Sequence, residues 1–396
     1  MSNKSDEVFL GFADSERELD YEVDFPIDVD GKIGGKPVWL DFEHPPEAES
    51  LHCTSCQKPM PLLLQIYAPI DSIASAFHRT LYVFCCKNGE CHKSQGRFKV
   101  LRCQLPEHNT LYVPLPHEDD SEPRLAKSEK SNPATLCEIC ASLGNKACGN
   151  CKQVHYCSRQ HQLDHWNVGH SQACKKLQNK EEVPKLKHHW SLFKEFELIT
   201  EKEVLNDNNS NNNKQLMPYI KDLKLSDPSE DTDSDEEEVA PKHKKNEPRH
   251  SEHNDDEDNA LVQDLENISK DKVFLKFQEA IRAFPDQVLR YYGLSGGAAP
   301  IWVNKDGQPT PADIPKCPHC HGPRVAEFQI TPQLLYMLEV DKVDSKDTLD
   351  WGILTVYSCQ HSCPAPDPKK PYLEEFLWRQ HFAAHDTVAK KEENKK

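Results

Sequence analysis

Long apolar runs are absent from this sequence of 396 residues. Hydrophobic residues make up 37 % of the chain and the mean hydropathy is −0.76, which is low for a chain that folds throughout its length. No segment approaches the ~18 apolar residues of a membrane span, and residues 1–8 lack the apolar stretch of a signal peptide. We therefore expect a protein of the cell interior, not bound to a membrane, with at least one disordered segment.

Motifs of several common enzyme classes are missing as well. The sequence contains no P-loop, no dinucleotide-binding fingerprint and no His-Glu-x-x-His. A nucleophilic cysteine is disfavoured, because nearly every cysteine has a place in one of the ligand sets described below. We predict that the protein is not an enzyme.

The chain has fewer basic residues than acidic ones. There are 48 Lys and Arg residues against 65 Asp and Glu, a net charge of −17, which disfavours direct nucleic-acid binding and suits a basic protein partner. Residues 226–258 alone hold 14 acidic residues against 4 basic ones, and residues 206–213 are Asn-rich. Residues 205–262 cannot bury enough surface to offset the entropy of ordering. We interpret them as a disordered linker, either a solvated spacer or an acidic segment that attracts a basic partner protein.

Cysteine, in contrast, is abundant. Because cytosolic thiols are kept reduced, sixteen cysteines in such a chain indicate metal ligands more than disulfides. Residues 137–174 place eight sulfur or imidazole groups within 38 residues, enough for two tetrahedral zinc sites. These groups are Cys137, Cys140, Cys148, Cys151, Cys157, His161, His170 and Cys174. The segment has few apolar residues, so metal binding is expected to supply its folding energy.

A second cysteine pattern occurs twice, once on either side of this segment. In each copy a tryptophan precedes a Cys-x2-Cys pair, which is followed by a Gln-Ile strand, an apolar strand that ends in cysteine, and one more cysteine. We interpret this as an internal duplication in which two half-domains share one sheet system. The two proposed zinc sets are Cys53, Cys56, Cys86 and Cys91, and Cys317, Cys320, Cys359 and Cys363. The alternative is structural thiols that pack without metal.

Several residues lie outside these sets. We expect Cys85 and Cys103 to be buried as small apolar groups. His319, His321 and His361 lie near the second outer set, either as exposed neighbours or as substitutes for one cysteine.

Apolar residues in 271–284 recur at helical spacing and predict a helix that ends at Pro285, and residues 287–292 are expected to form a short helix or turn.

The central segment resembles a MYND finger. The stretches 155–158, Gln162 and 165–166, together with the last two ligands, match the second half of that family. The resemblance implies interleaved ligation, with Cys137, Cys140, Cys157 and His161 on one zinc and Cys148, Cys151, His170 and Cys174 on the other. His161 departs from the family, in which most members have cysteine at that position. MYND fingers elsewhere mostly bind short proline-containing peptides.

The chain outside 205–262 resembles the programmed cell death protein 2 family. The matching stretches are 8–12, 34–40, 63–69, 76–86, the finger, 290–291, 327–335 and 350–359. The resemblance implies a dedicated chaperone or adaptor for a basic small-subunit ribosomal protein, the member conventionally numbered uS-five, in support of ribosome biogenesis. It further implies a cytoplasmic and nuclear location, with downstream effects on proliferation, stem-cell maintenance and apoptosis. The competing hypothesis is a transcriptional or corepressor adaptor whose finger binds Pro-containing peptides.

These features together predict an α+β, β-rich fold. A duplicated sheet domain is built from N- and C-terminal halves, with the finger inserted between them. The expected ranges are 1–115 for the N-terminal half, 133–177 for the finger, 178–204 for a connecting segment, 205–262 for the linker and 263–385 for the C-terminal half.

Overall fold

Ten strands form one closed barrel, and they come from both ends of the chain. The computed structural model describes residues 7–14, 30–93, 97–114, 125–179, 181, 190–204, 271–294, 298–341 and 348–382. The expected linker 205–262 lies outside these residues. The barrel order is β1–β10–β2–β3–β4–β5–β14–β13–β12–β11, closed by pairing of β11 with β1, and every neighbouring pair is antiparallel. The β-rich prediction is confirmed.

The barrel strands have the following bounds: β1 (Phe9–Asp14), β2 (Gly31–Ile33), β3 (Leu62–Tyr67), β4 (His78–Cys85), β5 (Phe98–Leu105), β10 (Phe196–Lys202), β11 (Gln287–Tyr291), β12 (Arg324–Ile330), β13 (Ile353–Cys359) and β14 (Leu373–Gln380). Smaller sheets pair β6 (Tyr112–Pro114) with β7 (Leu125–Lys127), and β8 (Lys146–Ala147) with β9 (His155–Tyr156). The helices include α1 (Arg159–His165), α2 (Ser171–Gln178), α5 (Lys272–Ala283) and α6 (Gln333–Met337). Among the described residues no helix has the length and apolarity needed to cross a membrane.

The central strands are buried on both faces. In β4 the side chains of Leu81 and Val83 belong to the main core cluster, whereas Tyr82 and Phe84 belong to a second cluster around Trp39. This alternation follows the two-residue period of a strand. The helix α5 begins after the capping carboxylate of Asp271 and packs Phe277 and Ile281 beside Ile353 of β13. The predicted helix in residues 271–284 is therefore confirmed.

Two three-stranded meanders, β3–β4–β5 and β12–β13–β14, make up most of the barrel and share local details. Each first strand carries a bulge two residues before its glutamine, at Leu63 and at Glu327. The Gln65 side chain donates to Val38 O and accepts from Val38 N, and Gln329 makes the same two bonds with Ile301. The two meanders meet directly, because β5 pairs with β14.

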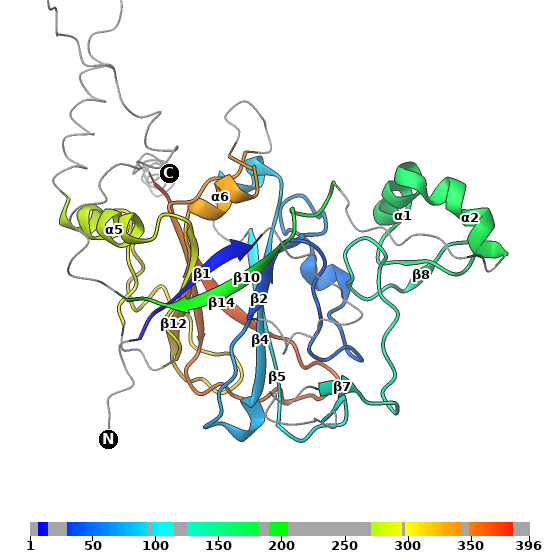
Figure 1. The fold of residues 1–396 in the computed structure, drawn as a ribbon, viewed down its shortest axis with the longest axis horizontal. Coiled ribbons are helices and arrows are strands. Elements are labelled where there is room, and N and C mark those ends of the chain that lie inside the picture. Colours follow the sequence, from blue (N-terminus) through cyan, green and yellow to red (C-terminus); the bar gives the residue numbers. More distant parts are fainter. Residues whose placement is uncertain are drawn as a thin grey trace, which may run out of the picture.

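The barrel corrects two expectations about local structure. Residues 287–291 form the strand β11, not a short helix or turn, because they pair with both β1 and β12 and bury Val288 and Leu289. Residues 196–202, in the segment expected only to connect the finger to the linker, form β10 between β1 and β2. In Figure 1 β10, from the middle of the chain, lies beside β1, from its N-terminal part, and the finger stands off to one side.

Candidate metal centres

Four groups of possible metal ligands assemble in the described part of the chain. In each group the four ligand atoms lie within 4.8 Å of one another. The groups are Cys53, Cys56, Cys86 and Cys91; Cys137, Cys140, Cys157 and His161; Cys148, Cys151, His170 and Cys174; and Cys317, Cys320, Cys359 and Cys363. The structure thus brings together every residue of each predicted set. None of the sixteen cysteines forms a disulfide.

The N-terminal centre forms where two strands of the first meander meet their loops. Cys53 and Cys56 lie in the loop before β3, Cys86 follows the last residue of β4, and Cys91 lies in the short helical turn Gly89–Lys93. The Sγ atoms of Cys56 and Cys86 are 3.7 Å apart. Cys53, Cys86 and Cys91 are buried beside Trp39 in the second core cluster. The N-terminal centre therefore links the second core cluster to the end of β4.

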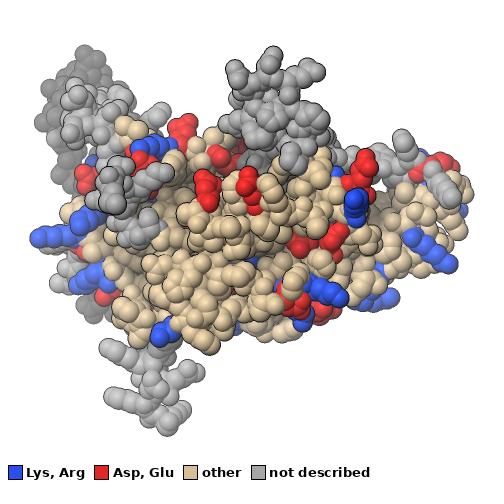
Figure 2. Space-filling model, turned by 90° about the horizontal axis from the view of Figure 1, so that it is seen from below, with Lys and Arg blue, Asp and Glu red and all other residues tan. Residues whose placement is uncertain are grey.

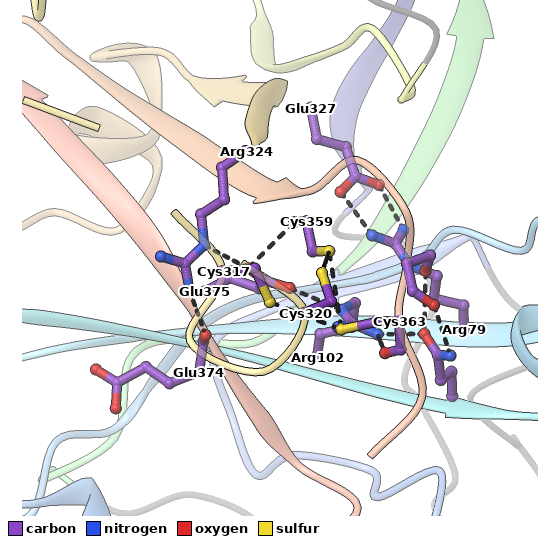
Figure 3. A network of polar contacts seen from close by, with 12 residues as sticks. Arg79, Arg102, Cys317, Cys320, Arg324, Glu327, Cys359, Cys363, Glu374 and Glu375 are labelled. Atoms are coloured by element: carbon purple, nitrogen blue, oxygen red, sulfur yellow. Dashed lines mark hydrogen bonds and ion pairs between the residues drawn. The ribbon is translucent and has the colours of Figure 1, made fainter. Parts of the chain in front are cut away.

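The C-terminal centre repeats this arrangement in the second meander (Figure 3). Cys317 and Cys320 precede β12, Cys359 is the last residue of β13, and Cys363 follows four residues later. The Sγ separations are 3.6 Å for Cys317 and Cys363, 3.5 Å for Cys320 and Cys359, and 3.8 Å for Cys359 and Cys363. The buried carboxylate of Glu375 accepts from the backbone N–H of Cys359 at 3.2 Å.

The finger holds two interleaved centres. In the first, His161 Nδ1 lies 3.5 Å from Cys137 Sγ and 3.2 Å from Cys157 Sγ. In the second, His170 Nε2 lies 3.3 Å from Cys148 Sγ and 3.7 Å from Cys151 Sγ. In the first centre Cys157 precedes α1, and the Ser158 cap, which accepts from His161 N, turns the chain so that both ligands meet.

The same tight turn holds all four Cys-x2-Cys pairs. In each pair the N–H four residues after the first cysteine donates to that cysteine's carbonyl, and the donating residue has a left-handed backbone. These residues are Gln57 (φ 58°), Ala141 (φ 55°), Lys152 (φ 58°) and His321 (φ 57°). A left-handed conformation is unfavourable for residues other than glycine. Four independent occurrences indicate that the turn is needed to aim both thiols at one point.

The turns also favour the thiolate form of the first cysteine. Burial acts to raise the pKa of Cys53, but hydrogen bonds from the backbone N–H groups of Cys56 and Ser55 and from the neighbouring thiols of Cys86 and Cys56 outweigh it, and the pKa is lowered. Cys317 has its pKa lowered in the same way by the N–H groups of Cys320 and His319. The thiolate is the form that binds metal. The turn therefore supplies the geometry and contributes to lowering the pKa of the first cysteine.

These distances suit zinc. With Zn–S bonds of ~2.3 Å, two sulfurs of a tetrahedral site lie about 3.8 Å apart, and a sulfur and an imidazole nitrogen about 3.5 Å apart. The separations in all four groups cluster around these values. The donor sets, two of four cysteines and two of three cysteines and one histidine, are those of structural zinc sites without an open position. The residues present therefore fit the ion.

The remaining predicted residues take minor positions. Cys85 and Cys103 are fully buried outside the four groups, as expected, and burial raises the pKa of Cys103 to about 12. His361 Nδ1 lies 3.8 Å from Cys320 Sγ, beside the second outer set but not in it. His319 and His321 also lie outside that set.

The finger is attached to the N-terminal half by specific contacts. Trp39 Nε1 donates to Ala141 O at 2.6 Å, and Lys36 pairs with Glu138 at 3.7 Å. The backbone of Leu143 donates to Pro46 O at 3.3 Å. The repeated tryptophan at position 39 therefore reaches the first turn of the finger, a role that its position in the sequence did not reveal.

One short sequence resembles a hydrolase motif without its context. Residues 293–297 read Gly-Leu-Ser-Gly-Gly, the spacing of a nucleophile elbow. Such an elbow leads from a strand directly into a helix. Here β11 ends at Tyr291, residues 295–297 lie outside the described part, and the next regular element is the strand β12. The described residues on either side therefore do not show the strand-to-helix context of such an elbow.

Comparisons with known proteins agree with these features. Residues 7–119 match the family model of the programmed cell death protein 2 N-terminal domain, 271–381 its C-terminal putative domain, and 137–174 the MYND finger. The chain is 34 % identical over 357 residues to programmed cell death protein 2 of Bos taurus, covering 88 % of this chain and 90 % of the relative. It is 35 % identical over 360 residues to the protein of that name from Mus musculus, with the same coverage. Programmed cell death protein 2-like of Mus musculus is 25 % identical over 370 residues. No solved structure matches.

Proposed function

Since the chain belongs to the programmed cell death protein 2 family, we propose that it is a zinc-dependent chaperone or adaptor for a basic ribosomal protein of the small subunit, the member conventionally numbered uS-five. The observation that carries the proposal is the net charge of −17. A newly made ribosomal protein is rich in Lys and Arg and lacks its RNA counterion. An acidic carrier attracts such a client by electrostatic steering and competes with RNA for it.

Much of the acidic excess lies in the linker. Residues 226–258 contribute −10 of the net charge of −17, whereas acidic and basic side chains are interspersed over the described surface visible in Figure 2. Exposed charges are screened over about 8 Å at physiological salt. We therefore assign the linker, which we propose to be disordered, to the rate of capture, and the barrel to the contact itself.

The zinc ions in this proposal have a structural role. We propose four zinc ions per chain, one in each group of ligands, and an origin of the two barrel halves by internal duplication. The ions would fix the turns around the cysteine pairs and no reaction would occur on them, since the donor sets leave no position open. Elemental analysis of purified protein should give about four zinc ions per chain. Two ions would remove the outer centres from the proposal.

Deletion variants test where the client binds. Removing residues 205–262 should leave equilibrium binding of the ribosomal protein largely intact and slow its association. Removing residues 133–177 should weaken binding only modestly, whereas Cys56→Ser or Cys320→Ser should abolish it. Retention of the ribosomal protein by the isolated finger would contradict the assignment to the barrel.

A second candidate function follows from the surface of the finger. Leu163, Trp166 and Val168 are 43, 40 and 44 % exposed on α1 and the turn that follows it. Exposed apolar side chains close together suit a peptide ligand, and this favours the adaptor for Pro-containing peptides. Affinity purification of the full chain separates the two: a ribosomal protein in near equal amounts supports the chaperone, and a set of chromatin factors lost in Trp166→Ala supports the adaptor.

Location and cell-level effects follow from the chaperone proposal. A carrier that meets its client during synthesis and delivers it to ribosome assembly must act in both cytoplasm and nucleus. Effects on apoptosis, proliferation and stem-cell maintenance would then be consequences of altered ribosome supply. No catalytic step is part of the proposal.

A further inference from the structure

The loop of each outer metal centre is contacted by a buried arginine from the opposite half of the barrel. Arg102 of β5, in the N-terminal half, donates from Nη1 to Cys363 O at 3.0 Å and places Nη2 3.9 Å from Cys363 Sγ (Figure 3). Arg379 of β14, in the C-terminal half, donates to the carbonyl of His92, the residue after Cys91. Both arginines are at least 97 % buried.

The two arginines occupy equivalent positions. Arg102 pairs across the sheet with Leu81, five residues before Cys86. Arg379 pairs with Leu354, five residues before Cys359. Because β5 and β14 are themselves paired, each guanidinium points over the seam to the loop that ends the other half's cysteine set. Each half of the barrel therefore supplies one arginine to the metal-centre loop of the other half.

The C-terminal centre receives the fuller set of contacts. Glu375 accepts from Arg102 Nε and Arg324 Nε, each at 2.8 Å, and also holds the N–H of Cys359. Gln104, two residues after Arg102, donates to Ser362 O at 3.0 Å. One strand of the N-terminal half thus fixes the loop from Cys359 to Cys363.

The chemistry of the site explains why a guanidinium lies there. Four thiolates around Zn²⁺ carry a net charge of −2, and burial of that charge is costly unless donors and cations surround it. Arg102 supplies both a hydrogen bond and a positive charge. A lysine would keep the charge but could not reach Cys363 and Glu375 with the same planar fork.

We propose that Arg102 and Arg379 are positioning residues for the outer metal centres, so that each half of the barrel controls metal retention in the other. This rests on the proposed zinc occupancy. It goes beyond that occupancy, because it makes retention of each ion depend on an arginine that the other half supplies across the β5–β14 seam. A partner that opened the seam would release metal, and a chelator that removed metal would loosen the seam.

Chelator-triggered alkylation with peptide mass spectrometry tests this on the full chain. The alkylation rate of every cysteine is followed in the presence of a chelator, with the finger cysteines as internal reference. Arg102→Met should raise the rate of Cys317, Cys320, Cys359 and Cys363 by about 10–100-fold, the usual effect of losing a hydrogen-bond partner of a ligand. Arg379→Met should do the same for Cys53, Cys56, Cys86 and Cys91.

Lys99→Met is the matched control. Lys99 also lies on β5 and forms a cross-seam ion pair, 3.1 Å from Glu374, without a contact to either centre. The Lys99→Met variant should leave the alkylation rate of every cysteine unchanged. Equal acceleration of both outer sets by Arg102→Met, or no acceleration, would overturn the proposal.

If Arg102→Met also raises the alkylation rate of the finger cysteines, the milder variant Arg102→Lys is measured in its place. A rise in alkylation rate confined to the C-terminal set then supports the proposal, and unchanged rates overturn it. Rapid alkylation of the outer sets in the unaltered chain without chelator would refute the metal occupancy on which the proposal rests.

Discussion

At Gly34 a second segment of backbone approaches the chain closely. Its φ is +61°, and a Cβ atom built there would lie 2.1 Å from Lys194 O. Its N–H donates to Leu63 O at 3.0 Å. Gly34→Ala should lower the free energy of unfolding by at least ~3 kcal/mol, since left-handed strain of ~1–2 kcal/mol adds to a steric clash with rigid backbone. Urea denaturation measures the loss.

Gly293 provides the control for this substitution. Its φ is +69°, but the nearest atom to a built Cβ is 3.9 Å away. Gly293→Ala should therefore cost only the backbone strain, about 1–2 kcal/mol. Equal losses for the two variants would show that the clash at Gly34 is relieved by movement of residues around Lys194.

A buried ion pair joins the two halves inside the barrel. Arg79 of β4 and Glu327 of β12 are fully buried and form two hydrogen bonds, of 2.5 and 2.8 Å. Arg79→Met should cost about 3–5 kcal/mol, because it leaves a carboxylate buried without its partner. The double variant Arg79→Met with Glu327→Leu should recover most of that loss. A double variant as unstable as the sum of both single variants would contradict this account.

The same pair predicts a pH dependence. Burial acts to raise the pKa of Glu327, but the charge and hydrogen bonds of Arg79 outweigh it, so the pKa is lowered from 4.5. A lowered pKa in the folded state adds stability that is full above the unfolded pKa and is lost as the pH falls through the folded value. The stability difference between the unaltered chain and Glu327→Gln should therefore shrink below about pH 4.5. A difference that grows on acidification would contradict the assignment.

Ligand positions could be predicted from the sequence, whereas their supporting residues could not. The spacing of Cys-x2-Cys pairs reflects local chelate geometry, so the repeated pattern grouped the two outer sets, whereas the grouping within the finger followed from its resemblance to a MYND finger. Arg102 and Arg379 contact the loops of centres more than 250 residues away along the chain, and nothing local marks them. The left-handed residues after the pairs are also hidden, because Gln57 and Lys152 are of types that rarely adopt that conformation.

At the scale of elements, β1 holds the barrel closed. It lies between β10 and β11, and its loss would leave two strands with unpaired edges. Deletion of residues 1–14 should therefore produce soluble oligomers or aggregates, detected by size-exclusion chromatography. Deletion of residues 1–6, which precede the strand, should leave an elution profile like that of the full chain. A monomeric 1–14 deletion of unchanged stability would show that the barrel closes without β1.

The strands that were predicted and those that were missed differ in their surroundings. The strands β4 and β13 are long, apolar and end in cysteine, so composition alone identifies them. The strand β10 carries three charged residues in seven, and residues 287–291 contain Gln287 and Arg290. Arg290 is accommodated because Glu203 accepts from its Nη2 at 2.9 Å. Such strands depend on long-range partners that a local pattern does not show.

At the scale of the whole molecule, the two halves cannot close separately. They meet along two seams, β5 with β14 and β1 with β11, and β10 completes the circle between β1 and β2. Expression of residues 1–204 or 263–396 alone should therefore give insoluble material, since each leaves open sheet edges. Co-expression of these two fragments should give a soluble complex, because all ten barrel strands are then present.

The pair 1–115 and 263–396 is the informative comparison. It contains both cysteine-bearing meanders but lacks β10, so β1 and β2 have no strand between them. We expect this pair to remain insoluble, or to form a complex that unfolds at much lower urea concentration than the 1–204 pair. The measurement is the denaturation midpoint of each co-purified complex, with zinc content determined in parallel. If the two halves instead purified as independent soluble monomers, the barrel would not be one cooperative unit. The link proposed between the seam and the outer metal centres would then lose its structural basis.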